Sequence, residues 1–294
     1  MAETSTDSTR RAPSFGVHTP LQHVSVAELR NLWHAADALG YAWISVWDHF
    51  VPVLGEGDNH EAIAMHAALA TATTRARVGC LVYNAGYRSA VVLAKAAATI
   101  DHLSGGRAVI GLGAGYLERE YHQFGIPFGT PGQRSDLLDA STREIRRLLD
   151  EVVLPRPIQN TLPLWIGGGG EKRTLPLTAR LADGWNIPMA SPETWRAKNA
   201  VLSRLIEDSG RRQTDVERTV SVGLCFDEKE IPERFGTNWT NLAPAVLAGS
   251  RDKIVDHIGR YVDAGADTII LSLRPPYRTD EIDQFAREIM SEFE

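Results

Sequence analysis

An adjacent aspartate and histidine, Asp48 and His49, directly follow the apolar run that ends at Trp47. Imidazole is the side chain whose pKa suits proton transfer near neutral pH, and a carboxylate accepts hydrogen bonds from a ligand. The pair can therefore supply a hydrogen bond and a proton to a bound molecule. The spacing alone is equally compatible with a structural histidine in a capped loop.

Four consecutive glycines, Gly167 to Gly170, stand between the apolar run Leu164–Ile166 and a stretch that favours a helix. Ordering them is costly, because glycine loses more backbone freedom on folding than any other residue. The run lacks the lysine and hydroxyl residue of a Walker phosphate loop. A glycine loop at a helix N-terminus still directs free N–H groups and the positive end of the helix dipole at a ligand. We therefore predict an anion site here, with a flexible turn as the alternative.

Other candidate residues also follow apolar runs. Asn84 and Arg88 lie in a polar, aromatic segment after Val78–Val82, which can line a flat ligand or form a plain surface loop. Gly113 belongs to a Gly-x-Gly-x-Gly segment whose third glycine is misplaced for a dinucleotide fingerprint, so it indicates close backbone approach or a tight turn. Arg274 can bind a carboxylate or phosphate, or pair with a surface acid.

Metal and disulfide chemistry have no support in the residue spacing. Cys80 and Cys225 lie in apolar runs without a Cys-x-x-Cys partner, so we expect two buried thiols. His60 and His66 do not form a His-Glu-x-x-His pair, and no other histidines or cysteines have metal-ligand spacing. We therefore predict no metal site.

The elements that must position these residues alternate along the chain. Each of eight apolar strand patterns is followed by a helical pattern, and the runs of Val, Ile and Leu indicate strands buried on both faces. This rhythm predicts one domain, a (β/α)8 TIM barrel over residues 13–294, with a doubly wound open sheet as the alternative. The predicted strands are 14–17, 42–47, 77–82, 108–112, 164–166, 184–187, 220–226 and 268–273. In a barrel, catalytic residues follow the strand ends, which is where the candidate residues stand.

Composition restricts the class of protein. The chain has 294 residues and a net charge of −6, which argues against a nucleic-acid surface. No apolar run approaches the roughly 18–20 residues that span a bilayer, so no membrane partner is expected. Residues 1–12 are polar and lack the apolar core of a signal peptide, so we expect a disordered leader on a cytoplasmic protein.

Several segments together resemble the luciferase-like monooxygenase superfamily, and within it the oxidoreductases that depend on the deazaflavin coenzyme F420. The resemblance is strong from Phe15 to about Asn186 and fades toward the C-terminus. It rests on residues 40–43, 47–50, 87–95, 99–107, 111–116, 121–128, 165–171 and 182–186. The Leu-Ser-Gly-Gly-Arg run and the Gly-Gly-Gly-Gly-Glu run, in this order, are specific in combination.

The resemblance implies a role for most of the candidate residues. Asp48 and His49 match a pair that touches the isoalloxazine-type ring, and His49 can act as acid. Leu81 and Val82 match a strand-end bulge whose strained backbone supports the ring from behind. Asn84 matches a polar position near the pyrimidine edge of the ring. The cofactor-binding set implied is Asp48, His49, Leu81, Val82, Asn84, Gly113, Gly167, Gly168, Gly169 and Gly170, with the four glycines on the cofactor phosphate.

The chain departs from the sugar-phosphate dehydrogenases of this family at two positions. Those enzymes place a glutamate directly after the Gly-x-Gly, where Tyr116 stands here, and a tryptophan shortly after the Asp-His pair, where Val53 or Leu54 stands here. Both departures weaken a sugar-phosphate assignment.

The leading hypothesis is hydride transfer between F420 and a small organic substrate, with reduction of a C=C or C=N bond. His49 is the candidate acid and Tyr116 a second donor, while Arg88 or Arg274 holds a substrate carboxylate. One alternative is an FMN-dependent monooxygenase that uses reduced flavin and oxygen; another is a barrel that binds flavin or deazaflavin without turnover. Relatives often pair, so we expect a homodimer, served by an external F420 or flavin reductase. Replacement of Gly168 by valine is expected to weaken cofactor binding more than it changes the fold.

Overall fold

The computed structural model describes residues 12–53, 55–236 and 239–293. Of the predicted leader, residues 1–12, only Ala12 is among them. No helix among these described residues is both long enough and apolar enough to cross a membrane.

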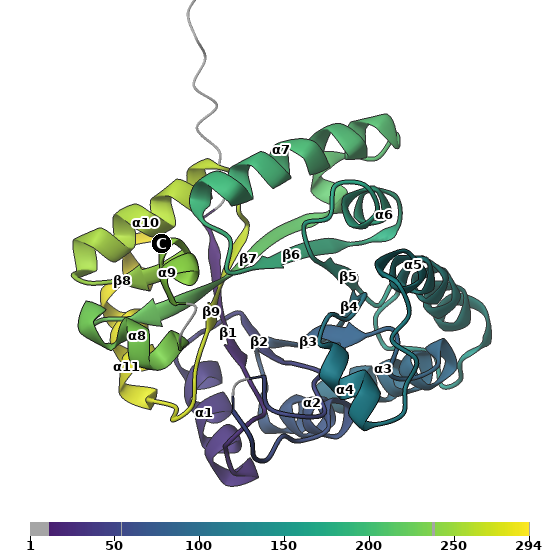
Figure 1. The fold of residues 1–294 in the computed structure, drawn as a ribbon, viewed down its shortest axis with the longest axis horizontal. Coiled ribbons are helices and arrows are strands. Elements are labelled where there is room, and N and C mark those ends of the chain that lie inside the picture. The colour runs from purple at the N-terminus through teal and green to yellow at the C-terminus, as the bar shows by residue number, and fades with distance from the viewer. Residues whose placement is uncertain (1–11, 54, 237–238, 294) are drawn as a thin grey trace, which may run out of the picture.

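Eight parallel strands close into a barrel, with helices around the outside (Figure 1). Each strand pairs with the next, and β9 pairs with both β7 and β1, which closes the ring. The predicted (β/α)8 barrel is therefore confirmed and the open-sheet alternative is wrong. The barrel strands are β1 (Ser14–Thr19), β2 (Trp43–Val46), β3 (Arg77–Asn84), β4 (Ala108–Gly113), β5 (Leu164–Gly167), β6 (Gly184–Pro188), β7 (Glu217–Cys225) and β9 (Thr268–Ser272).

The longer helices begin where capping residues predict. Ser25 accepts a hydrogen bond from the Glu28 N–H and completes a capping box, and Ser89 and Thr130 cap two later helices with their hydroxyl groups. The helices that follow the barrel strands are α1 (Val26–Ala38), α2 (Ala62–Ala72), α3 (Ala90–Ser104), α4 (Glu118–Gln123), α5 (Pro131–Arg147), α6 (Thr174–Leu181), α7 (Pro192–Asp208), α10 (Arg251–Asp263) and α11 (Thr279–Glu288).

One part of the chain has structure that the sequence patterns did not predict. The end of β7 extends beyond the barrel, where Gly223–Cys225 pairs with a ninth strand, β8 (Val246–Ala248). Two short helices, α8 (Ile231–Phe235) and α9 (Trp239–Leu242), lie between these strands along the chain, and the segment sits at one side of the barrel (Figure 1). Elements of three to five residues carry too little periodicity to be recognised.

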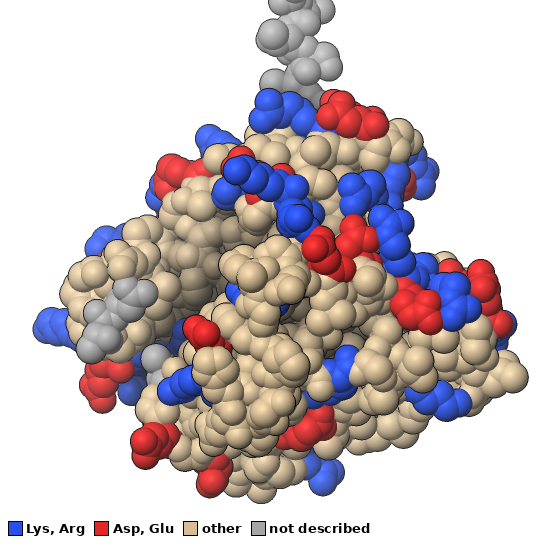
Figure 2. Space-filling model, turned by 45° about the vertical axis from the view of Figure 1, so that its right-hand side comes forward, with Lys and Arg blue, Asp and Glu red and all other residues tan. Residues whose placement is uncertain are grey.

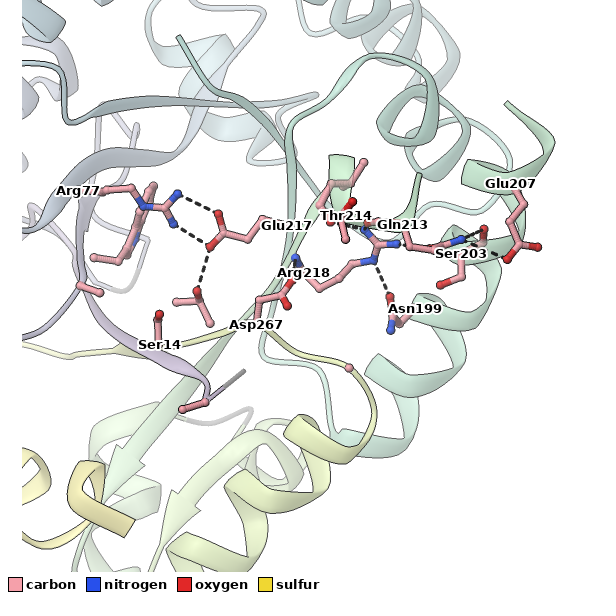
Figure 3. A pocket seen from close by; sticks show the side chains of 16 residues that line it. Ser14, Arg77, Asn199, Ser203, Glu207, Gln213, Thr214, Glu217, Arg218 and Asp267 are labelled. Atoms are coloured by element: carbon pink, nitrogen blue, oxygen red, sulfur yellow. Dashed lines mark hydrogen bonds and ion pairs between the residues drawn. The ribbon is translucent and has the colours of Figure 1, made fainter. Parts of the chain in front are cut away.

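The N-terminal ends of the strands enclose a cleft of about 1030 Å³ whose two arginines, Arg77 and Arg218, are hydrogen-bonded to other groups of the protein (Figure 3). Arg77 makes two hydrogen bonds to Glu217, at 2.9 and 2.7 Å, and its guanidinium lies over the stacked rings of Trp43 and Trp165. Arg218 donates to Asn199 and to neighbouring groups. The Arg77 and Arg218 side chains thus find their hydrogen-bond partners within the protein. Because residues at this end of a TIM barrel serve stability, we assign the cleft a structural role.

Candidate active site

A cavity of about 540 Å³ lies at the other end of the barrel, where the strands end at their carboxyl termini. This volume is within the ~300–1,000 Å³ of small-molecule sites. Almost every candidate residue lines it, although these residues come from five different loops of the chain. The lining set includes Asp48, His49, Leu81, Val82, Asn84, Gly113, Tyr116, Gly167, Gly168, Gly169, Gly170 and Arg274. Val53 also lines the cavity, whereas Leu54 is outside the described residues.

His49 is held in place by Glu120, a residue that sequence reasoning missed. Glu120 lies on α4, is completely buried, and is 2.9 Å from His49 Nδ1. It also accepts hydrogen bonds from the backbone N–H groups of Phe50, at 2.7 Å, and Val51, at 3.1 Å, and from the Tyr87 hydroxyl. Burial disfavours its charge, but the hydrogen bonds from His49, Tyr87 and Val51 hold the pKa of Glu120 below its ordinary value. The carboxylate thus fixes the ring of His49.

The other ring nitrogen of His49, Nε2, makes no hydrogen bond with any residue in the described ranges. The ring packs edge-on against Tyr116, with centroids 5.7 Å apart, and Tyr116 stands at the rim with 65% of its surface exposed. This leaves Nε2 available for a proton transfer, because Nδ1 is already engaged by Glu120.

Asp48 and Arg88 form an ion pair with each other. Arg88 donates to both oxygens of Asp48, at 2.6 and 3.0 Å, and to Glu61 at 3.0 Å. The Asn84 N–H donates to Asp48 as well, at 2.8 Å. Arg88 is not among the residues that line the cavity, so the substrate role expected for it has no support in the geometry. Its guanidinium is already satisfied by two carboxylates.

The glycine loop has structural reasons for its composition that the sequence did not reveal. A Cβ on Gly167 would lie 2.8 Å from Val82 Cγ1, and one on Gly169 would lie 2.7 Å from Ile187 Cδ1. Gly168 has a φ of +115°, which side chains other than hydrogen rarely allow. Packing inside the protein therefore accounts for part of the run, a reason that neither the predicted anion site nor the alternative of a flexible turn included.

The loop nevertheless presents free donors to the cavity. The Gly168 N–H donates to the Asn186 carbonyl at 2.9 Å, and the indole of Trp185 donates to the Gly168 carbonyl at 2.8 Å. These two bonds fix the loop. The N–H groups of Gly169 and Gly170 have no hydrogen-bond partner among the described residues, and α6 begins shortly afterwards at Thr174. Two free N–H groups near a helix N-terminus can bind one phosphate.

Val82 forms part of the cavity wall between the glycine loop and Asn84. The Leu81–Val82 peptide bond is cis, and the β3–β4 register shifts between Cys80 and Tyr83. A Cβ on Gly113 would lie 2.5 Å from Val82 Cγ2. Glycine at position 113 thus makes room for Val82, as glycine at 167 does.

The side chain of Asn84 has its oxygen fully engaged, and its amide lies beside the Tyr87 hydroxyl, where it opposes the rise that burial causes in the pKa of Tyr87. Its Oδ1 accepts hydrogen bonds from the Tyr121 hydroxyl, at 2.7 Å, and from the Gly86 N–H, at 2.9 Å. Because a side-chain NH₂ carries two hydrogens, Asn84 can still donate one of them to a bound molecule.

Arg274 has no hydrogen bond or ion pair with any described residue, unlike Arg88. Its Nε is buried without a partner, and its guanidinium lies 5.7 Å from the centre of the Phe235 ring on α8. Burial lowers the pKa of Arg274, with Tyr277 and Tyr116 nearby acting in the opposite direction. A partly buried cation without a carboxylate partner among the described residues can bind an anionic group.

The described residues contain no group of three His, Cys, Asp or Glu side chains that could hold a metal ion. Cys80 and Cys225 are buried and unpaired, as predicted.

A family model described as luciferase-like monooxygenase matches residues 8–231, more than half of the chain. The F420-dependent glucose-6-phosphate dehydrogenase of Kineococcus radiotolerans is 28% identical over 209 residues, which cover 65% of this chain and 60% of that protein.

Two solved structures share the fold. An F420-dependent secondary alcohol dehydrogenase in complex with an F420-acetone adduct has a TM-score of 0.85 at 17% identity, covering 95% of this chain and 98% of its own. The oxygenating constituent of 3,6-diketocamphane monooxygenase from Pseudomonas putida, in complex with FMN, has a TM-score of 0.75 at 12% identity, covering 96% and 99%.

Proposed function

The chain belongs to the luciferase-like monooxygenase family, and we propose that within it the protein is an F420-dependent oxidoreductase acting on a small organic substrate. The observation that carries this proposal is the arrangement of one cavity. It has, among the described residues, two backbone N–H groups without a partner at the end of β5, a guanidinium without a partner after β9, and His49 after β2. In the ring of strands, β5 and β9 are separated by β6 and β7, so the two anion sites lie on different sides of the mouth.

The residues present fit a deazaflavin with a phosphate tail. The N–H groups of Gly169 and Gly170 would hold the phosphate, Val82 would lie against the ring, and the Asn84 amide would donate to its polar edge. When bound, the cofactor supplies a hydride to the substrate or takes one from it.

The remaining groups of the cavity would act on the substrate. Arg274 binds a substrate carboxylate, which orients the reducible bond, and His49 Nε2 delivers the proton that completes the reduction. Tyr116 at the rim is a second donor. Between turnovers, an external reductase would restore the reduced cofactor.

Fluorescence titration of the pure protein with F420 and with FMN tests the cofactor assignment. Binding of F420 below about 1 μM without comparable binding of FMN supports the proposal; the reverse result selects the alternative below. Turnover is then measured by mixing the protein with reduced F420 and levulinate, 2-cyclohexenone, crotonate or 1-pyrroline-2-carboxylate. This panel offers C=O, C=C and C=N bonds with and without a carboxylate. If no member of the panel oxidises reduced F420, the proposal of an oxidoreductase for this class of substrate is contradicted.

An FMN-dependent monooxygenase is the second candidate, because a monooxygenase in complex with FMN shares the fold. FMN also has a ring and a phosphate, so the same loop and the same Asn84 amide would serve it. A barrel that only binds its cofactor has less support, since His49 keeps both its orienting carboxylate and an open Nε2.

We further propose that the protein forms a homodimer through α2 and α3. These helices form a shallow apolar groove of about 400 Å³, lined by Ile63, Ala67, Val91, Val92, Lys95, Ala96, Thr99 and Ile100. Val91 and Val92 are 57% and 50% exposed, and a contiguous exposed apolar surface of this kind marks interaction sites in proteins.

A further inference from the structure

The cavity contains a second histidine that the mechanism above does not use. His18 lies near the end of β1, lines the cavity and is only 7% exposed. Its Nδ1 is 2.9 Å from the hydroxyl oxygen of Ser45, a completely buried residue of β2.

The surroundings of Ser45 determine which nitrogen of His18 carries the hydrogen. A buried hydroxyl hydrogen needs an acceptor, and His18 Nδ1 is the partner that the Ser45 hydroxyl has among the described residues. Ser45 therefore donates to Nδ1, and the ring hydrogen must be on Nε2. This Nε2 has no hydrogen bond to a described residue and does not belong to the buried unpartnered atoms, so it opens into the cavity.

The charge of His18 is set by its neighbours. Burial, with Arg274 after β9 and His49 after β2 facing the ring, lowers the pKa of His18 to about 3. The imidazole is therefore neutral at physiological pH. The two histidines differ in what anchors them, since His49 is held by the carboxylate of Glu120 and His18 by a hydroxyl. Different environments for two titratable groups in one cavity indicate different roles.

We propose that His18 is a second catalytic group, a neutral N–H donor that binds the oxygen or nitrogen of the substrate's C=O or C=N bond. The inference rests on the proposed function and extends it. Hydride adds to the substrate carbon, with its two electrons supplied by the reduced cofactor, and the π-electron pair moves onto the heteroatom. His18 Nε2–H stabilises the negative charge that develops there. The heteroatom then takes the proton carried by His49 Nε2, which leaves His49 as a neutral ring with its Nδ1–H on Glu120. A donor fixed before the reaction is effective because no reorganisation is needed.

The tautomer is tested directly in the protein without cofactor. Long-range ¹H–¹⁵N correlation spectra between pH 5 and 8 should show His18 as the neutral Nε2–H form throughout, with its signals assigned from their loss in His18→Gln. Ser45→Ala should convert part of the population to the Nδ1–H form. A wild-type ring that is Nδ1–H, or an imidazolium at pH 6 or above, overturns the inference. The tautomer can be measured even if the protein does not use F420. A wrong tautomer can therefore be distinguished from a wrong cofactor assignment.

Kinetics test the role. His18→Leu should slow single-turnover oxidation of reduced F420 by levulinate about 100-fold, as for loss of one oxyanion donor. His18→Gln, whose amide can donate from a similar position, should recover most of this rate, and His34→Leu on the exposed face of α1 is the matched control. If His18→Leu retains the wild-type rate while remaining folded, His18 is not catalytic. If no panel substrate reacts, the proposed function fails and the catalytic role of His18 fails with it, while the tautomer measurement still decides the state of the His18 ring.

Discussion

At the scale of single residues, the carboxylate of Glu120 decides what His49 can do. It binds one ring nitrogen and three other donors from two βα loops, so it acts through His49 as a positioning residue. No local pattern identifies it, because Glu118 and Arg119 beside it are equally polar and only the fold brings α4 against the loop after β2.

We expect Glu120→Gln to slow hydride transfer about 10- to 100-fold and to shift its pH dependence, because an amide cannot hold Nδ1–H as a carboxylate does. Single-turnover rates between pH 5 and 9 measure both effects. Glu118→Gln, on the exposed side of the same helix, is the control and should behave as wild type. A slower variant with an unchanged pH profile would indicate a purely structural role for Glu120.

Arg274 and Arg88 differ in their ion pairs, since Arg88 is bound by two carboxylates and Arg274 by none among the described residues. Arg274→Gln should raise KM for levulinate about 10- to 100-fold, because the substrate carboxylate loses its charge-assisted hydrogen bonds, but it should leave 2-cyclohexenone almost unaffected. Arg278→Gln removes a surface arginine that is paired with Glu230 and serves as the control. Equal loss with both substrates would show that Arg274 does not bind the carboxylate.

At the scale of elements, the glycine loop joins β5 to α6 and carries two kinds of constraint. The expectation that Gly168→Val weakens cofactor binding more than it changes the fold is wrong. A φ of +115° is a strained conformation for any side chain, so the substitution would lower the stability of the fold together with cofactor binding. Gly170 has no such φ, and a Cβ there would approach mainly the flexible Thr174 hydroxyl, at 2.9 Å.

Gly170→Ala is therefore the more selective change. It should weaken F420 binding about tenfold by crowding the phosphate, with less than about 1 kcal/mol lost in the free energy of unfolding. Gly168→Ala should instead cost more than 1 kcal/mol. Fluorescence titration and urea unfolding of both variants measure the two quantities. A normal affinity in Gly170→Ala would place the phosphate elsewhere.

At the scale of the whole molecule, buried neutral histidines make stability depend on pH. Burial lowers the pKa of His66, on α2, to about 4, and its Nδ1 lies 2.9 Å from the Tyr83 hydroxyl. Its pKa in the unfolded chain is near 6.5. The unfolded state therefore binds the proton first as pH falls. The contribution of neutral His66 to the free energy of unfolding, fully present above pH 6.5, is lost progressively down to about pH 4.

We expect His66→Asn to reduce this pH dependence by about 1.4 kcal/mol per pH unit between pH 6 and 4.5, the slope for one proton. Urea unfolding at several pH values gives the slope separately from any uniform loss caused by the changed packing. His34→Asn, on the surface, should leave the slope intact. An unaltered slope in His66→Asn would mean that His66 is protonated in the folded protein.

The apolar groove on α2 and α3 is the surface to which we assign dimer formation. On the face shown in Figure 2, cationic side chains lie mixed with anionic ones. Val92→Lys should convert a dimer to a monomer in light scattering after size-exclusion chromatography, because a buried lysine lacks a partner there. Leu137→Lys, an equally exposed apolar position on α5, is the control. A wild-type monomer at micromolar concentration would contradict the proposal.

The sequence by itself determined the eight-strand barrel and the place of the site. Buried parallel strands have a local pattern, and their carboxyl ends meet at one edge, so Asp48, Asn84, Gly113, Gly167 and Arg274 had to converge. Only the tertiary structure decided how each of these residues is used. Hydrogen-bond partners, backbone φ and burial depend on residues distant along the chain. For that reason, neighbouring residues in the sequence could not reveal four features of the site. These are the hydrogen bond between Glu120 and His49, the neutral state of His18, the ion pair of Arg88 with Asp48, and the lack of a described partner for Arg274.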